Sequence, residues 1–134
     1  MTRNKELTMS RMYVHGLIAI TLLLGSACGG GSDRPALDPA TVAKADQIFA
    51  QRCTPCHGAD GRGDGSASAA LKPKPRNFHE ADWQSSVTDA HIEKIIQVGG
   101  AGVGKSPVMP PNPDLTDKAV VTALMSKIRG FSGK

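Results

Sequence analysis

The sequence predicts an all-α fold of three to five helices joined by long loops. Three stretches carry apolar residues at helical spacing, and each follows a residue of the type that caps helices. The segments between them are rich in glycine and proline, which interrupt regular structure. No stretch reads convincingly as a β-strand, so no sheet is predicted.

The first expected helix has Asp38 as its N-cap and Pro39 at its first helical position. Proline is well suited to that position because the N–H it lacks would have no partner within the helix. Apolar residues continue at helical spacing up to Cys53, where we expect the helix to end.

Two further helices are predicted by their caps. One begins after Thr88 and ends at Gly99, with isoleucines on one face. The last begins after Thr116 and stops near Gly130. Between the first helix and these two, residues 77–85 are expected to hold a short helical turn that carries two aromatic side chains.

The start of the chain has the features of an export signal. Basic residues come first, and the apolar run at 17–24 is too short to span a bilayer. Small residues then precede Cys28. We therefore divide the chain into a signal peptide at 1–27, a flexible tether at 28–37 and a folded domain at 38–134.

Two processing outcomes remain open at this cysteine. The stretch around Cys28 resembles bacterial lipoprotein leaders, in which the cysteine becomes the lipidated first residue, although Gly25 stands where leucine is usual. Alternatively, signal peptidase cuts after Ala27 and the thiol is incidental. Both outcomes place the folded domain outside the cytoplasm.

The run Cys53-Thr54-Pro55-Cys56-His57 is the strongest chemical signal in the chain. Two thiols separated by two residues, with histidine next, form the attachment signal of haem c. Each sulfur adds to one vinyl group of the haem, and the histidine then lies beneath the ring, where its imidazole can bind the iron. We therefore predict one covalent haem c on Cys53 and Cys56, with His57 as an axial iron ligand.

Other uses of paired cysteines fit less well. A thioredoxin-like redox pair needs a βαβ setting, which this chain lacks. A zinc site needs two more ligands, and no second cysteine or histidine pair follows. Nucleic-acid binding is not predicted, because the net charge is only +4 and no stripe interleaves basic and aromatic residues.

Residues 38–131 resemble class I c-type cytochromes, which carry one haem. The resemblance rests on the first helix leading into the Cys53–His57 motif, the glycine-containing loop after it, Met109-Pro110-Pro111 in a late loop, and the final amphipathic helix. It implies a fold wrapped around the haem, with Met109 as the second iron ligand. It also implies that Ala45 and Phe49 pack the first helix against the third helix, which is the last in the chain.

The setting of Met109 favours the same role. It lies in an irregular loop before two prolines that stiffen the backbone, whereas a methionine that fills a core more often lies on a helix face. Two histidines are rival ligands. His79, near the preceding loop, is the better rival, and His91 is expected to point elsewhere from the first turn of its helix.

The resemblance implies further contacts with the haem. Arg76 and Trp83 resemble residues that hold the haem propionates. The carbonyl group that orients the ring of His57 is expected between Leu71 and Pro73.

An iron held by both His57 and Met109 has no open position for a substrate. The predicted function is therefore one-electron transfer in the bacterial periplasm, without enzymatic turnover. The expected partners are redox proteins and, through Cys28, a membrane. The alternatives are a haem-based sensor or peroxidase-type enzyme with an open distal site, or an electron-transfer subunit of a larger respiratory complex.

Overall fold

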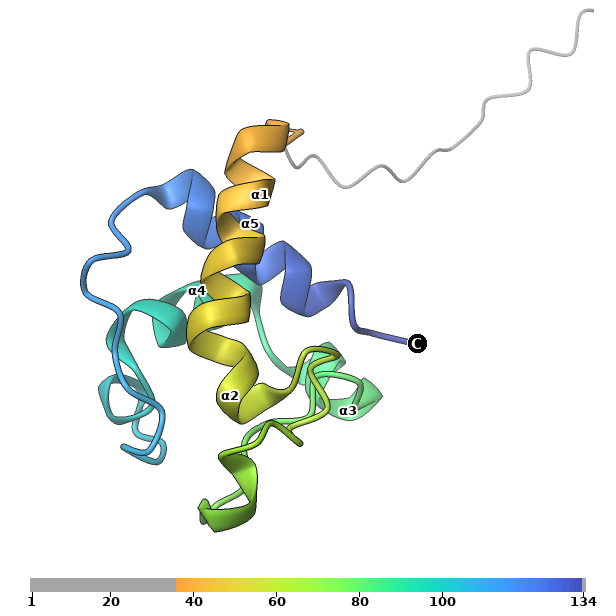
Figure 1. Cartoon of the computed structure of the whole chain (residues 1–134), viewed down its shortest axis with the longest axis vertical. Helices are drawn as coiled ribbons and strands as arrows, with labels where there is room; N and C mark the ends of the chain where they lie inside the picture. Colours follow the sequence, from red (N-terminus) through yellow and green to blue (C-terminus); the bar gives the residue numbers. More distant parts are fainter. Residues whose placement is uncertain (1–35, 134) are drawn as a thin grey trace, which may run out of the picture. The chain divides into compact units, whose positions relative to one another are not determined.

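The computed structural model describes residues 36–133, and these residues form helices and loops with no strand (Figure 1). The prediction of an all-α fold is thus confirmed. The signal peptide, most of the tether and Cys28 lie outside the described residues. The elements, in order, are α1 (Pro39–Ile48), a π-helical turn (Phe49–Cys53), α2 (Thr54–His57), a 3₁₀ turn (Ser68–Ala70), α3 (Ala81–Ser86), α4 (Asp89–Val98), a 3₁₀ turn (Ala101–Val103) and α5 (Lys118–Arg129).

The start of α1 is as predicted. The side chain of Asp38 accepts the backbone N–H of Thr41 at 3.0 Å, and Pro39 occupies the first turn. The predicted end is wrong, because the chain does not leave the helix at Cys53. It continues through the π-helical turn into α2 and stops at Gly58, which has a φ of 81°. The haem-attachment motif is therefore itself helical, at the end of one continuous helical column (Figure 1).

The caps of α4 are also as predicted. The Thr88 side chain accepts the N–H of His91, and Gly99 ends the helix with a φ of 70°. The expected cap of α5 is wrong by one residue. Asp117, and not Thr116, accepts the N–H groups of Ala119 and Val120. A carboxylate at this position also interacts favourably with the positive end of the helix dipole.

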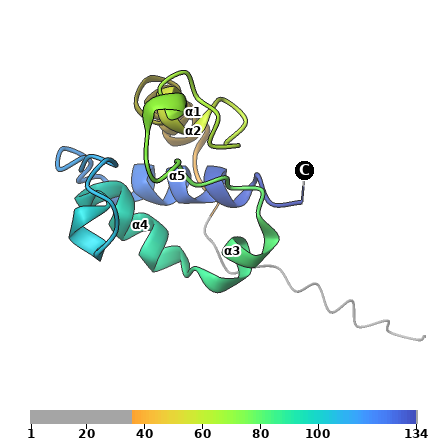
Figure 2. The same cartoon turned by 90° about the horizontal axis from the view of Figure 1, so that it is seen from below.

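α5 lies between α1 and α4 and forms the centre of the helical core (Figure 2). Ala45 and Phe49 are both 2% exposed and belong to this core, as the resemblance implied. Near the end of α5, Lys127 lies with Nζ 5.2 Å from the centre of the Phe49 ring and 2.8 Å from a carboxylate oxygen of Asp46. The α1–α5 contact thus combines apolar burial with one charged side chain.

The end of α5 is tied to the segment that contains α3. The guanidinium of Arg129 donates to the carbonyl groups of Gln84 and Val87, both at 2.6 Å, and to a carboxylate oxygen of Asp89 at 2.7 Å. Gln84 is buried, and its amide donates to the carbonyl of Phe78 at 2.7 Å. This network fixes Phe78 in position at the wall of the cavity described below.

No helix within residues 36–133 is long and apolar enough to cross a membrane.

Candidate functional site

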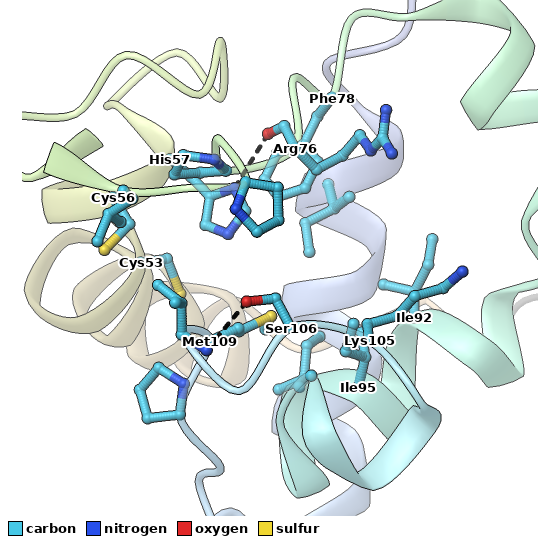
Figure 3. Close-up of a pocket in the computed structure, with 18 of the residues that line it drawn as sticks. Cys53, Cys56, His57, Arg76, Phe78, Ile92, Ile95, Lys105, Ser106 and Met109 are labelled. Atoms are coloured by element: carbon cyan, nitrogen blue, oxygen red, sulfur yellow. Dashed lines mark hydrogen bonds between the residues drawn. The ribbon is translucent and has the colours of Figure 1, made fainter. Parts of the chain in front are cut away.

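A cavity of about 480 Å³ opens between the helical column, the loop before α3, and α4 with the loop that follows it (Figure 3). The volume lies in the usual range of ligand and cofactor pockets. Most of the cavity wall is apolar. The apolar lining residues are Leu71, Pro73, Pro75, Phe78, Trp83, Ile92, Ile95, Ile96, Val108, Met109, Pro110 and Ile128.

The predicted attachment residues all line this cavity. Cys53 and Cys56 are free thiols, each partly buried. Burial raises the pKa of Cys53 to about 11, so its thiol is protonated at neutral pH. Redox-active cysteine pairs have a lowered pKa. The environment of Cys53 therefore does not fit a thioredoxin-like function.

His57 is oriented through one ring nitrogen. Its Nδ1 lies 3.0 Å from the carbonyl oxygen of Arg76, and since a carbonyl can only accept, Nδ1 donates. This tautomer leaves the lone pair of Nε2 available to a metal. Burial lowers the pKa of His57, which favours the neutral imidazole that iron requires. The ring of Phe78 stacks on the imidazole at 4.5 Å between centroids.

The prediction that a carbonyl between Leu71 and Pro73 orients the histidine is wrong. The loop after the motif folds back, since the N–H of Gly63 donates to the carbonyl of His57 at 2.8 Å. Gly63 has a φ of 75°, and a Cβ on it would lie 2.5 Å from the carbonyl oxygen of Pro75. Because of this close approach, the carbonyl of Arg76, the residue after Pro75, reaches the ring of His57.

Met109 lies across the cavity from His57 (Figure 3). The N–H of Gly100 donates to its carbonyl oxygen at 3.0 Å, which fastens the loop to the end of α4. Gly99 has a φ of 70°, and a Cβ there would lie 2.7 Å from the same oxygen. The glycine-rich stretch after α4 thus allows the loop of Met109 to pass close to the helix.

The prediction that His91 points elsewhere is wrong. His91 lines the cavity from the first turn of α4. His79 is not among the lining residues, and its Nε2 lies 2.7 Å from the carbonyl oxygen of Asp60. The N–H of His91 donates to the side chain of Thr88 at 3.2 Å, which places the histidine in the first turn of α4.

Arg76 and Trp83 both line the cavity, and the guanidinium carbon of Arg76 lies 6.0 Å from the centre of the Trp83 ring. Arg76 also pairs with Glu80 at 2.6 Å. Their role as partners of haem propionates stays a prediction.

Sequence reasoning missed five polar lining residues, which are Arg52, Lys74, Lys105, Ser106 and Asn112. Arg52 directly precedes the attachment motif, but its partner lies far away in the sequence. The other four lie in loops rich in glycine or proline, where no local pattern indicates which side chains turn inward.

The residues present fit a haem. Two thiols, an imidazole and a thioether line one largely apolar cavity, and the imidazole and the thioether lie on opposite sides of it (Figure 3). Soft sulfur and imidazole are the axial donors of electron-transferring haem iron. Within residues 36–133, no three His, Cys, Asp or Glu side chains are grouped as ligands for a bare metal ion.

Comparison with known proteins points the same way. The family model of cytochrome c matches residues 42–125. A solved structure described as KustC0563 c-type cytochrome is similar, with a TM-score of 0.51 and 29% sequence identity. The match covers 66% of this chain and 96% of that one. No curated protein sequence matches.

Proposed function

Because this chain belongs to the cytochrome c family, which binds haem c covalently through a Cys-x-x-Cys-His motif, we propose that it is a periplasmic one-electron carrier with His57 and Met109 as iron ligands. The observation that carries this proposal is the placement of both side chains on one cavity, on opposite sides (Figure 3). Bound haem supplies a one-electron couple between ferric and ferrous iron.

The protein residues set the conditions for that couple. The carbonyl of Arg76 accepts the Nδ1 proton of His57, so Nε2 would be the ring nitrogen that binds the iron of a haem. The thioether of Met109 favours the ferrous state, which raises the reduction potential. The apolar wall would keep water from the iron of a bound haem, and with both side chains as ligands no position would remain for a substrate.

The test of this function is spectroscopic. Mature protein from a bacterium that attaches haem c should show, when oxidised, the weak sulfur-to-iron band at the red end of the visible spectrum. When reduced, it should bind carbon monoxide poorly, because the thioether occupies the sixth position. Fast, tight binding of carbon monoxide by the reduced wild type would instead identify a sensor or peroxidase-type enzyme with an open distal site.

We further propose that Cys28 carries lipid and holds the domain at the periplasmic face of a membrane, where it meets redox protein partners. The proposal rests on the apolar run, the small residues and the glycine-rich stretch that follows Cys28 in the sequence. Stable anchoring requires more than one acyl chain, which lipoprotein processing supplies.

Replacing this cysteine separates the two processing outcomes. We expect Cys28→Ser to move the holoprotein from the membrane fraction to the soluble periplasmic fraction, with its visible spectrum unchanged. Mass spectrometry of the wild-type N-terminus is the companion measurement. A soluble wild type without acyl mass would show that Cys28 is an incidental thiol.

A further inference from the structure

An ion pair with two parallel contacts joins the attachment segment to the loop that carries Met109. Arg52, directly before Cys53, donates from Nη1 to Oδ1 of Asp114 at 2.9 Å and places Nη2 2.8 Å from Oδ2. The same Nη1 lies 3.4 Å from the side-chain oxygen of Asn112. A planar guanidinium bound to both carboxylate oxygens fixes orientation as well as distance.

Both partners are presented by stiff backbone. Arg52 lies in the π-helical turn of the helical column, so its Cα moves with the attachment motif. Asp114 follows Met109 by five residues, and three of the four residues between them are proline. Each proline restricts φ, so a displacement of Asp114 is transmitted to Met109 over a short, stiff segment.

The charges respond to one another. The guanidinium of Arg52 lowers the pKa of Asp114 by hydrogen bonding, and the carboxylate raises the pKa of Arg52. Both groups therefore stay ionised throughout the neutral range.

The other polar contacts of the loop run elsewhere. The carbonyl of Met109 accepts from Gly100, and Asn112 donates to the carbonyl groups of Ile96 and Gln97 at the end of α4. All of these bonds move with α4. Within residues 36–133, no hydrogen bond or ion pair other than those of Arg52 joins residues 49–58 to residues 104–117.

We propose that the Arg52–Asp114 pair is a latch that holds the loop of Met109 against the attachment segment and slows the departure of the thioether from the iron. The proposal rests on the proposed ligation by His57 and Met109. Arg52 and Asp114 are positioning residues, since neither supplies an atom to the iron. With the pair open, the hydrogen bonds that still hold residues 109–115 within the described chain run to α4 and the glycines after it.

The expected effect is moderate. The side chains of Arg52 and Asp114 are 41% and 58% exposed, so water and salt screen their attraction. Exposed pairs contribute little to stability, and a geometry with two parallel contacts stands at the upper end of that range. Loss of the latch should therefore accelerate release of the thioether about two- to fivefold.

The experiment uses the oxidised holoprotein mixed rapidly with imidazole. At saturating imidazole the rate of binding is limited by release of the thioether, and loss of the sulfur-to-iron band reports it. We expect Asp114→Asn to raise this limiting rate two- to fivefold. Arg52→Lys keeps the charge but loses the planar fork, so we expect a smaller increase in the same direction.

The ion pair between Lys127 and Asp46 supplies the matched control. The side chain of Asp46 is 54% exposed, a fraction similar to that of Asp114. Its ion pair, however, joins α1 to α5 and does not involve the loop of Met109. Asp46→Asn should leave the limiting rate unchanged even where it lowers the melting temperature. High salt should raise the wild-type rate toward that of Asp114→Asn and leave the rate of Asp114→Asn itself nearly constant.

A double-mutant cycle completes the test. With a latch, Arg52→Gln combined with Asp114→Asn releases the thioether no faster than either single variant. The latch is refuted if the two substitutions have additive effects on the rate of thioether release. It is also refuted if Asp46→Asn raises that rate as much as Asp114→Asn does, or if Asp114→Asn leaves the rate unchanged. If the wild type itself lacks the sulfur-to-iron band, the proposed ligation fails first and the latch fails with it. A band with unchanged rates refutes the latch alone.

Discussion

A chain in which Cys53 and Cys56 are both replaced by alanine should carry no covalently bound haem. The wild-type mature protein should instead show the mass of one added haem, and its haem should resist extraction by acidified organic solvent. The effect is expected to be complete, because thioethers form only at these two sulfurs. Haem would also leave the variant more readily, since the iron ligands alone would hold it.

The third cysteine of the chain provides the control for this experiment. Cys28→Ser removes a thiol but leaves the attachment motif intact, so its covalent haem content should equal that of the wild type. Haem that survives extraction from the Cys53→Ala, Cys56→Ala variant would contradict attachment through these residues.

The second large effect is expected from Met109→Ala. The variant should lose the sulfur-to-iron band, bind carbon monoxide rapidly when reduced, and show a lower reduction potential. Axial ligands set haem potentials over about 0.8 V, so we expect a fall on the order of 0.2 V. The variant should still carry haem, because both cysteines and His57 remain. Voltammetry of the purified holoprotein measures the shift.

Two further variants interpret that result. Met125, on α5, is 2% exposed in the hydrophobic core and does not line the cavity. Met125→Leu should therefore retain the sulfur-to-iron band and the wild-type reduction potential. If Met109→Ala fails to bind carbon monoxide, His91 is the side chain to replace next, because it lines the cavity. Recovery of carbon monoxide binding in Met109→Ala, His91→Ala would identify the histidine as the substitute ligand. An unchanged spectrum in Met109→Ala would show that Met109 is not a ligand.

Local signals predicted the elements that local interactions decide. The caps Asp38 and Thr88 and the terminating Gly99 were correctly read because each acts on backbone groups within a few residues. The passage of the helix through Cys53 was missed because a π-helical turn adds one residue and has no simple periodic signature. The division of the chain at residue 28 stays a prediction.

The same difference between local signals and tertiary contacts applies to the residues of the site. The cysteine spacing and the following histidine could be read directly, since the chemistry demands consecutive positions. The partner of the His57 ring was misplaced, because a fold-back at Gly63 decides which carbonyl arrives. Arg52 was not singled out, because its meaning depends on Asp114, which lies 62 residues away. Such pairs are specified by the tertiary fold and not by any window of sequence.

The location of the cavity also bears on the order in which the protein matures. The packing of α1 on α5 uses Ala45, Phe49 and Leu124, none of which lines the cavity, so the two helices can associate before haem arrives. The loops on either side of α3 and α4 also contribute apolar side chains to the wall of the cavity, which a haem would cover. An early helix pair would then present Cys53 and Cys56 from an open face to the attachment machinery. Attachment would come before closure, and the loops would assemble last.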